Sequence, residues 1–430
     1  MAKFINQQNA DADKQVQLRF PKGVDQVSAE TALLPGTARR IVNLDVHQGA
    51  IGEKGPVGGR LSRRSAVQRA ISGVGVHSLW SGEHNTCYVS GGSLYLLDTN
   101  LQPVLIHAAV GDDEMFYVEI AGKVFYSNGV LAGTIYAGVR DVWGIPLPPA
   151  PVAAAMTSGG LVAGDYMVAY THMDAYGRES GATQTTKLAV VAGGGIALSG
   201  LVDTGYVTRV YVTPPNGEAM YWVQDIPRGA SVSYVGAHVP GKLLMNQHLA
   251  PLEPCTHLES YNGRIYGAVG TALVATQALN YYLSRPATDF VMFPDPITLV
   301  KSVVDGVYVG TRHGVTYLDG NDLGLFKMRP ADMLPPIPGS ALVVDGGLFG
   351  ESGKGIVWLT RRGWVYAGAG GRVKRLTESQ MAIPEYDRAA SLYREHDGMR
   401  QVMTFVKGGG EAAGASDSYD VEIVRNGRIV

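Results

Sequence analysis

The feature that most constrains this chain is a short β-rich segment that repeatedly follows a glycine turn. The pattern reads Gly-x-(Val/Leu/Ile)-(Tyr/Phe), and it occurs both early and late in the 430 residues. Glycine permits the positive φ of a tight turn, and the β-branched and aromatic residues after it favour a strand. The segments are Gly92–Asp98, Gly122–Asn128, Gly263–Tyr266, Gly306–Gly310 and Gly347–Phe349, with a looser version at Gly398–Met403.

The spacing of these turns predicts an architecture. The later glycines are 43, 41 and 51 residues apart, and partner strands follow a turn away, as at Gly314–Asp319 and Gly363–Tyr366. Units that recur every ~40–50 residues are typical of β-propeller blades. One small blade cannot cover its own apolar faces, so blades stack about an axis and bury them mutually. We therefore predict a mainly β fold built as a β-propeller, with an irregular array of β-sandwiches as the alternative.

Composition supports short strands rather than helices. Charged residues make up only 17% of the chain, whereas it contains 56 glycines and 22 prolines. Few charges with many glycines argue against long solvent-exposed helices and for strands joined by tight turns. The formal net charge of −2 also argues against a protein dedicated to clamping duplex DNA, which is normally visibly basic.

The repeat is interrupted after a proline-rich linker at Ile145–Pro151, where each proline favours an extended chain. Alternating strands follow, and one hairpin turns through Pro214–Gly217. This predicts an inserted immunoglobulin- or fibronectin-III-like β-sandwich. The strands are Tyr166–Thr171, Gly195–Ser199, Val207–Thr213, Met220–Val223 and Ser231–Val235. The predicted organisation is an extended N-terminal arm at 1–30, a first propeller part at 31–146, the sandwich at 150–238 and a second propeller part at 240–430.

No catalytic constellation stands out in the sequence. Gly350–Gly355 suggests a phosphate loop, but Leu348 replaces a required glycine and Gly355 replaces the metal-binding Ser or Thr. Ser352–Trp358 resembles the Asp-box turn of sialidase propellers, with Lys354 in place of the aspartate. We expect no catalytic residues, no metal site and no cofactor, and a protein that is not an enzyme. Near strand ends, His77, His84 and His107 are interpreted as hydrogen-bonded structural histidines.

Positive charge gathers between residues 36 and 72, where seven basic residues face two acidic ones. Guanidinium groups suit phosphate oxygens, so contact with DNA phosphate is one interpretation, and pairing with carboxylates of a neighbouring subunit is the favoured one. The candidate contact residues are Arg39, Arg40, Arg60, Arg63, Arg64 and Arg69.

Cysteine content and the first residues bear on location. Cys87 and Cys255 allow one disulfide at most, and the lack of a C-x-x-C motif favours a reducing compartment. The start has no apolar core of a signal peptide, and no run approaches 18 apolar residues. We expect a soluble protein made in a cytoplasm, with no membrane insertion.

Several phrases of the sequence together resemble a known protein family. They resemble tail nozzle or hub proteins (tail tubular protein B type) of short-tailed bacteriophages, over residues 20–405. The phrases are Asn43–His47, Tyr117–Gly129, Val142–Pro146, Thr256–Tyr266 and Tyr308–Asp319.

The resemblance implies a structural virion protein, located in the tail and assembled in the host cytoplasm. It implies a cyclic homo-oligomer, a hexamer, whose ring is a channel for DNA ejection. The adaptor and portal lie above this ring, a tail fibre or spike lies below it, and double-stranded DNA passes through transiently. Two alternatives stay open: a receptor- or glycan-binding tail-tip or spike component and, more weakly, a propeller glycosidase.

We expect that replacing Arg60, Arg63 and Arg64 with alanine weakens ring assembly more than it changes DNA release. The reason is that subunit pairing assigns these guanidinium groups to carboxylates of a neighbouring copy. Native mass spectrometry of the purified variant measures the oligomer, and a DNA-ejection assay measures release. Unaltered oligomer stability would reject subunit pairing.

Overall fold

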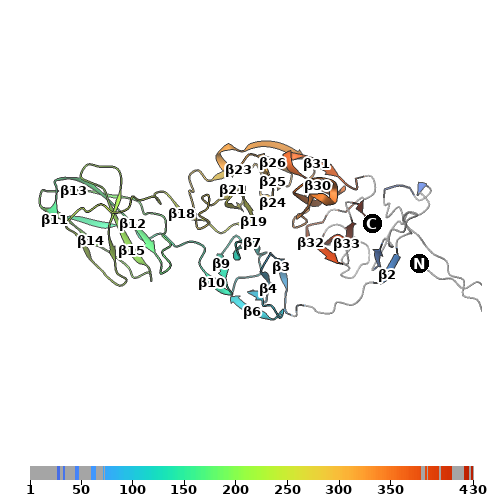
Figure 1. Ribbon diagram of the computed structural model, residues 1–430, viewed down its shortest axis with the longest axis horizontal. Coiled ribbons are helices and arrows are strands. Elements are labelled where there is room, and N and C mark those ends of the chain that lie inside the picture. Colours follow the sequence, from blue (N-terminus) through green and yellow to red (C-terminus); the bar gives the residue numbers. More distant parts are fainter. Residues whose placement is uncertain are drawn as a thin grey trace, which may run out of the picture. The chain divides into compact units, whose positions relative to one another are not determined.

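The structure is a computed structural model that describes residues 73–378 without interruption (Figure 1). Outside this stretch it describes 27–29, 32–33, 44–47, 60–63, 71, 383–384, 386–396, 399–408, 421–425 and 428–429. These residues fall into two compact units. Unit 1 contains the described residues of 1–72, 295–321 and 325–430, and unit 2 contains residues 73–294 and 322–324.

Unit 2 contains three four-stranded antiparallel sheets that are up-and-down meanders. A small two-stranded sheet accompanies the third, formed by β18 (Ala250–Pro251) and β22 (Leu283–Ser284). The first meander is β3 (His77–Ser81), β4 (Thr86–Ser90), β5 (Ser93–Leu97) and β6 (Pro103–His107). The second is β7 (Phe116–Ile120), β8 (Lys123–Ser127), β9 (Ala132–Tyr136) and β10 (Val139–Asp141). The third is β19 (Thr256–Tyr261), β20 (Arg264–Val269), β21 (Ala272–Ala275) and β23 (Phe290–Met292).

These meanders pack face to face because their strands are apolar on both sides. On β8, Val124 and Tyr126 join a core shared with the first meander, while Phe125 joins a core shared with the third. Successive side chains of a strand point to opposite faces, so one apolar run supplies two interfaces. Trp143, just beyond β10, fills the second of these cores, and its indole N–H donates to the carbonyl of Tyr281 at 2.7 Å.

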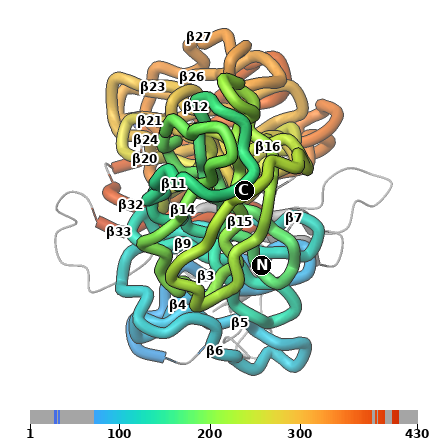
Figure 2. The backbone as a smooth tube through the Cα atoms, turned by 90° about the vertical axis from the view of Figure 1, so that its left-hand side faces the viewer, coloured from blue at the N-terminus to red at the C-terminus, as the bar shows by residue number. Residues whose placement is uncertain are grey.

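The inserted sandwich lies between the second and third meanders in the chain (Figure 2, green). Its core alternates in the same way, because Tyr166, Val168 and Tyr170 of one sheet pack against Ile196 and Leu198 of the other. Two antiparallel sheets packed over such a core define a β-sandwich. One sheet is β11 (Val152–Leu161), β14 (Gly194–Ser199) and β17 (Ser233–Val235); the other is β13 (Thr186–Val190), β12 (Gly164–Met173), β15 (Val207–Val212) and β16 (Tyr221–Ile226).

Unit 1 contains three more four-stranded meanders and the hairpin of β1 (Leu44–His47) and β2 (Arg60–Arg63). The first is β24 (Ile297–Val303), β25 (Gly306–Thr311), β26 (Gly314–Asp319) and β27 (Lys327–Asp332). The second is β28 (Leu342–Asp345), β29 (Lys354–Thr360), β30 (Gly363–Ala367) and β31 (Val373–Arg375). The third is β32 (Arg388–His396), β33 (Met399–Lys407), β34 (Val421–Arg425) and β35 (Arg428–Ile429).

Strand β29 of unit 1, like β8 of unit 2, supplies side chains to two cores on opposite faces of its sheet. Its Trp358 packs with Tyr308 of the preceding meander, whereas Val357 and Leu359 pack toward Val402 of the following one. Stacked four-stranded meanders of this kind are propeller blades. The prediction of a mainly β, propeller-type fold interrupted by an inserted sandwich is therefore confirmed.

One predicted β segment is wrong. Gly347–Phe349 lies in the 3-10 helix η3 (Gly346–Phe349), because the Asp345 side chain accepts a hydrogen bond from the Gly347 N–H and Gly350 ends the turn in the left-handed region. Gly398 lies outside the described residues. Two further 3-10 helices within residues 73–378 are η2 (Leu323–Leu325) and η4 (Ala369–Gly371). Within the described part of the chain, none of the helices has the length and apolarity to span a bilayer.

Both cysteines are free and buried, so the possible disulfide is not formed. Cys87 belongs to the core between the first two blades of unit 2, and Cys255 to the core between the second and third. Burial raises the pKa of each thiol to about 12.

We expect both thiols to resist modification in the native protein and to react fully when it is unfolded. At a pH of about 8 the native labelling rate with Ellman's reagent should be more than ~100-fold below that of an ordinary exposed cysteine, because the thiolate is the reacting form. The measurement compares native buffer with concentrated guanidinium chloride, using Cys87→Ser and Cys255→Ser to separate the sites. Equal rates in the two solvents would contradict this account of burial.

Candidate functional site

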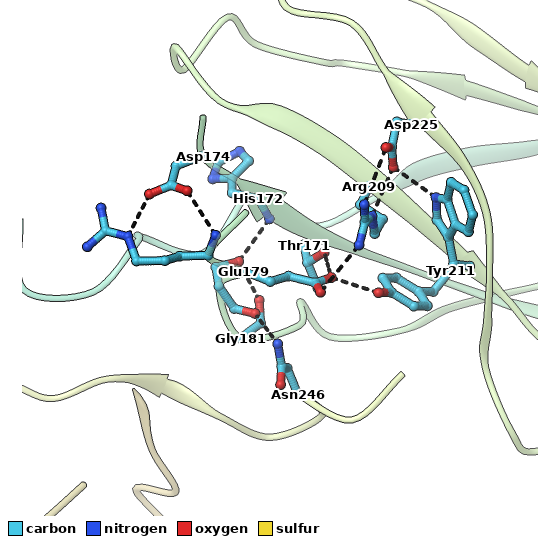
Figure 3. A network of polar contacts seen from close by, with 12 residues as sticks. Thr171, His172, Asp174, Glu179, Gly181, Arg209, Tyr211, Asp225 and Asn246 are labelled. Carbon is cyan, nitrogen blue, oxygen red and sulfur yellow. Dashed lines mark hydrogen bonds and ion pairs between the residues drawn. The ribbon is translucent and has the colours of Figure 1, made fainter. Parts of the chain in front are cut away.

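A polar network lies in unit 2 where the sandwich adjoins the blades, and it is built on a tight turn after β12 (Figure 3). The Asp174 carboxylate accepts backbone hydrogen bonds from Tyr176 and Arg178, both at 2.9 Å. This is the Asx geometry in which an aspartate closes the turn that follows it. The turn therefore fixes the chain at the point where Arg178 leaves it.

Arg178 joins the sandwich to the second blade. Its Nε lies 2.6 Å from Asp174 Oδ2, and its Nη2 lies 2.6 Å from Asp141 Oδ2 at the end of β10. Burial opposes ionisation of Asp174, but hydrogen bonds from Arg178 and Tyr176 outweigh it and hold the pKa of Asp174 below its ordinary value. One guanidinium thus bridges a carboxylate of the turn after β12 and a carboxylate of β10.

A cavity of about 190 Å³ lies beside this bridge. The Arg178 guanidinium also packs over the ring of Tyr282, 5.1 Å from its centroid, and Lys123 Nζ donates to the Tyr282 hydroxyl at 2.6 Å. Arg178 Nη1 is buried and has no hydrogen-bond partner among the described residues. A cavity of this size with polar side chains in its lining suits water or a small molecule. It is lined by Gly144, Ile145, Arg178, Glu179, Asn246, Asn280 and Tyr282.

The next residue, Glu179, directs its carboxylate into the sandwich. Its Oε1 accepts hydrogen bonds from the Thr171 hydroxyl at 2.5 Å and the Tyr211 hydroxyl at 2.7 Å, and Arg209 Nη1 lies 3.6 Å from Oε2. Burial, together with the bond to Glu179, raises the pKa of Tyr211 above its ordinary range. Side chains of β12 and β15 therefore converge on this carboxylate, which helps to hold the two strands together.

Arg209 of β15 extends the network across the same sheet to β16. Its Nε lies 3.0 Å from Asp225 Oδ1, and its guanidinium lies over the Trp222 ring at 5.2 Å. The Trp222 indole N–H donates to the same oxygen of Asp225 at 2.8 Å. The chain of contacts therefore alternates in charge from β10 through the turn to β15 and β16.

His172 ties the proline linker to the sandwich. Its Nδ1 lies 2.9 Å from the carbonyl oxygen of Pro146, and its Nε2 lies 3.0 Å from the Thr204 hydroxyl. Burial lowers the pKa of His172, against the opposing effect of the bond to Pro146. Both ring nitrogens are engaged, which is typical of a structural histidine.

The predicted arginine cluster lies largely outside the described residues. Arg60 and Arg63 are the ends of β2 and pair in register with His47 and Leu44 of β1. The predicted subunit or phosphate contacts of all six arginines stay predictions. The positions outside the described residues are Arg39, Arg40, Arg64 and Arg69.

The other predicted motifs take structural roles. His77, His84 and His107 each make a side-chain hydrogen bond, to Ser78, Glu119 and Tyr126 respectively. The loop at 350–353 leads into β29, which is a strand and not the helix that a phosphate loop requires. Among the described residues there is no group of three or more His, Cys, Asp or Glu side chains that could hold a metal ion.

No protein-family model matches the sequence, and no curated protein matches it. The chain resembles the solved structure of BBS1N in complex with ARL6DN at 13% identity and a TM-score of 0.30, covering 79% of this chain and 90% of that one. It resembles PorZ of Porphyromonas gingivalis at 12% identity and 0.21, covering 89% and 62%, and an ancestral GH74 enzyme at 9% and 0.22, covering 81% and 71%. Likeness at such TM-scores is too weak to assign fold or function, so the fold rests on strand pairing and buried cores.

We expect Arg178→Ala to lower the free energy of unfolding by about 2 kcal/mol, because it removes charge-assisted hydrogen bonds and leaves Asp141 and Asp174 without their shared partner. The control is Lys187→Ala, which removes an ion pair to Asp165 between exposed side chains and should cost less than about 0.5 kcal/mol. Urea unfolding of both variants measures the difference. Equal losses in the two would contradict a bridging role for Arg178.

Proposed function

We propose that this protein is a structural subunit of a bacteriophage virion, a tail nozzle or hub protein of the tail tubular protein B type. In this role identical subunits form a cyclic homo-hexamer, whose ring is the channel for DNA ejection and links the adaptor to the distal tail. The subunit is not an enzyme, and it acts in the virion after assembly in the host cytoplasm.

The observation that carries the proposal is where the phrases that resemble this family fall in the fold. Tyr117–Gly129 spans the β7–β8 hairpin, Thr256–Tyr266 spans β19–β20, and Tyr308–Asp319 spans β25–β26. These are blade hairpins before and after the inserted sandwich. The resemblance thus lies on the repeated scaffold, as expected if the whole arrangement of blades and insertion is shared.

The physical character of the chain agrees with a conduit. Many phosphate contacts make DNA binding tight and strongly salt-dependent, which would impede passage. A formal net charge of −2 suits a wall along which DNA slides. The bridge from Arg178 to Asp141 couples the sandwich to the second blade and so favours a stiff subunit.

A second function, recognition of a receptor or glycan at the tail tip, is favoured by exposed aromatic side chains on the sandwich. Tyr176 is 83% exposed at the tip of the Asp174 turn, and Tyr234 on β17 is 59% exposed. Aromatic faces with polar tips suit the faces of sugar rings. Binding to a glycan array that is lost in Tyr176→Ala would favour this alternative.

We expect the purified full-length protein to form closed rings with six-fold symmetry, because head-to-tail contacts between identical subunits close only at a fixed rotation. Negative-stain electron microscopy with two-dimensional averaging measures the symmetry, and native mass spectrometry counts the subunits. The adaptor protein of the same virion serves as the binding partner in a pull-down. A monomer that neither forms rings nor binds the adaptor would overturn the proposal.

A further inference from the structure

Two neighbouring blades of unit 1 carry the same turn at the same place in the sheet. Thr311–Gly314 joins β25 to β26 with the sequence Thr-Arg-His-Gly, and Thr360–Gly363 joins β29 to β30 with Thr-Arg-Arg-Gly. In each, the threonine hydroxyl accepts a hydrogen bond from the N–H two residues later, that of His313 at 3.3 Å and that of Arg362 at 3.2 Å. The same local structure is therefore built twice.

The outer positions of these turns are fixed by packing. Gly314 and Gly363 have φ of +140° and +92°, and a Cβ would lie 2.3 Å from the Asp332 carbonyl oxygen at the first and 2.0 Å from Thr377 Oγ1 at the second. Glycine is required at both. The central pairs, 312–313 and 361–362, are exposed, so packing does not dictate which residues stand there.

The fold does not require charge at this point of a blade. The corresponding turns between second and third strands in unit 2, residues 91–92, 128–131 and 270–271, contain no charged residue. In unit 1 the two central pairs supply three arginines and a histidine. The positive charge is therefore a property of these two turns and not of the blade fold.

An ion pair places the two turns at the same end of unit 1. Asp332 lies opposite Val315 at the start of β26, next to the first turn, and Arg375 lies opposite Val365 of β30, next to the second. Arg375 Nη2 lies 3.0 Å from Asp332 Oδ1. The salt bridge thus spans the two blades at the end where both turns lie.

The cations at this end face outward, while two of the three nearby carboxylates are buried. The side chains of Arg312 and His313 are 74% and 67% exposed, and both contact the buried carboxylate of Asp295 at 2.6 Å. One fixed anion thereby holds two donors on a rigid hairpin. Asp332 is also buried, so the cationic groups reach the solvent at this end while these two carboxylates do not.

The second turn is less neutralised by its surroundings. Arg362 lies 3.0 Å from Glu378, which also pairs with Arg375 at 2.7 Å. Hydrogen bonds from these arginines hold the pKa of Glu378 below its ordinary value, so it stays ionised. Arg361 is exposed and makes no ion pair or side-chain hydrogen bond within the part of unit 1 that the structure describes.

We infer that these two turns, the basic turns (311–314 and 360–363), contact the sugar–phosphate backbone of double-stranded DNA. The inference rests on the proposed function and deepens it by naming a surface for the passing genome. Guanidinium groups match phosphate oxygens, and backbone contacts of this kind position DNA without reading its sequence. Three arginines per subunit give weak contacts that salt disrupts, which is compatible with sliding.

An acidic protein surface is the competing partner, and the composition of the turns disfavours it. Binding energy at protein interfaces concentrates in Trp, Tyr and Arg side chains that are packed in fully desolvated pockets. The central pairs, 312–313 and 361–362, contain neither Trp nor Tyr, and their residues are exposed rather than packed in a pocket.

The test measures binding of the full-length protein to a fluorescein-labelled duplex of about 30 base pairs by anisotropy, between about 50 and 200 mM salt. In Arg312→Ala/Arg361→Ala/Arg362→Ala, the slope of log K against log salt should shrink in magnitude by about 2–3 for each bound subunit, since each phosphate contact contributes about 0.9. Arg361→Ala alone breaks no ion pair or side-chain hydrogen bond among the described residues, so it guards against misfolding of the triple variant; it should lower the slope by about 1. The matched control is Arg228→Ala, an exposed arginine of the sandwich, with no change expected.

Binding by the triple variant equal to that of the Arg228→Ala control overturns the inference. So does a triple variant whose rings weaken while DNA binding is retained, since the turns would then contact an acidic neighbour. Native mass spectrometry on the same samples shows whether rings form, which tests the proposed function separately from DNA contact by the basic turns. If wild-type rings form but do not bind DNA, the inference that the basic turns contact DNA is overturned and the proposed function is not. If no rings form, the proposed function is overturned.

Discussion

The structure depends on one constraint: each small sheet is apolar on both faces and must be covered on both. In β8, Val124 and Tyr126 pack against one neighbouring sheet and Phe125 packs against the other. In β29, Trp358 and Val357 pack against opposite neighbouring sheets in the same way. Because a strand alternates its side chains, a continuous apolar run becomes two interfaces without any helix to cover it. Stacking in series covers both faces of the middle blade in each unit.

Because the strands fill the apolar cores, the polar contacts described above lie mainly in and around the connections between strands. The longest connection holds a whole sandwich, and the joint is electrostatic as well as apolar, since Arg178 binds Asp174 beside it and Asp141 on the blade. Partly buried bridges of this kind add orientation more than net stability, because desolvation offsets much of the attraction. The bridge therefore bears chiefly on how firmly the sandwich keeps its orientation.

The sequence predicted the fold class because glycine turns and apolar alternation are local signals, but it did not fix the register of the blades. Gly122 and Gly263 lie between the first and second strands of their blades, whereas Gly92 lies between the second and third, so the spacing of 30 residues from Gly92 to Gly122 is not a blade period. Gly347 failed for another reason, because Asp345 captures its N–H and closes a 3-10 turn. Side-chain capping competes with strand pairing, and a pattern of apolar residues does not reveal it.

The polar sites were harder to predict because their partners are distant in the chain. Arg178 meets Asp141 from 37 residues away, and only an Asp turn followed by adjacent opposite charges marks the place. The basic turns carry a signal in the sequence, since Thr-Arg-x-Gly occurs twice at equivalent blade positions, but glycine periodicity by itself marks only the strands. In a repeat fold, packing dictates the glycines and apolar positions. Packing does not constrain the exposed residues that differ between equivalent turns. These positions can therefore change to bind a partner without disturbing the blade.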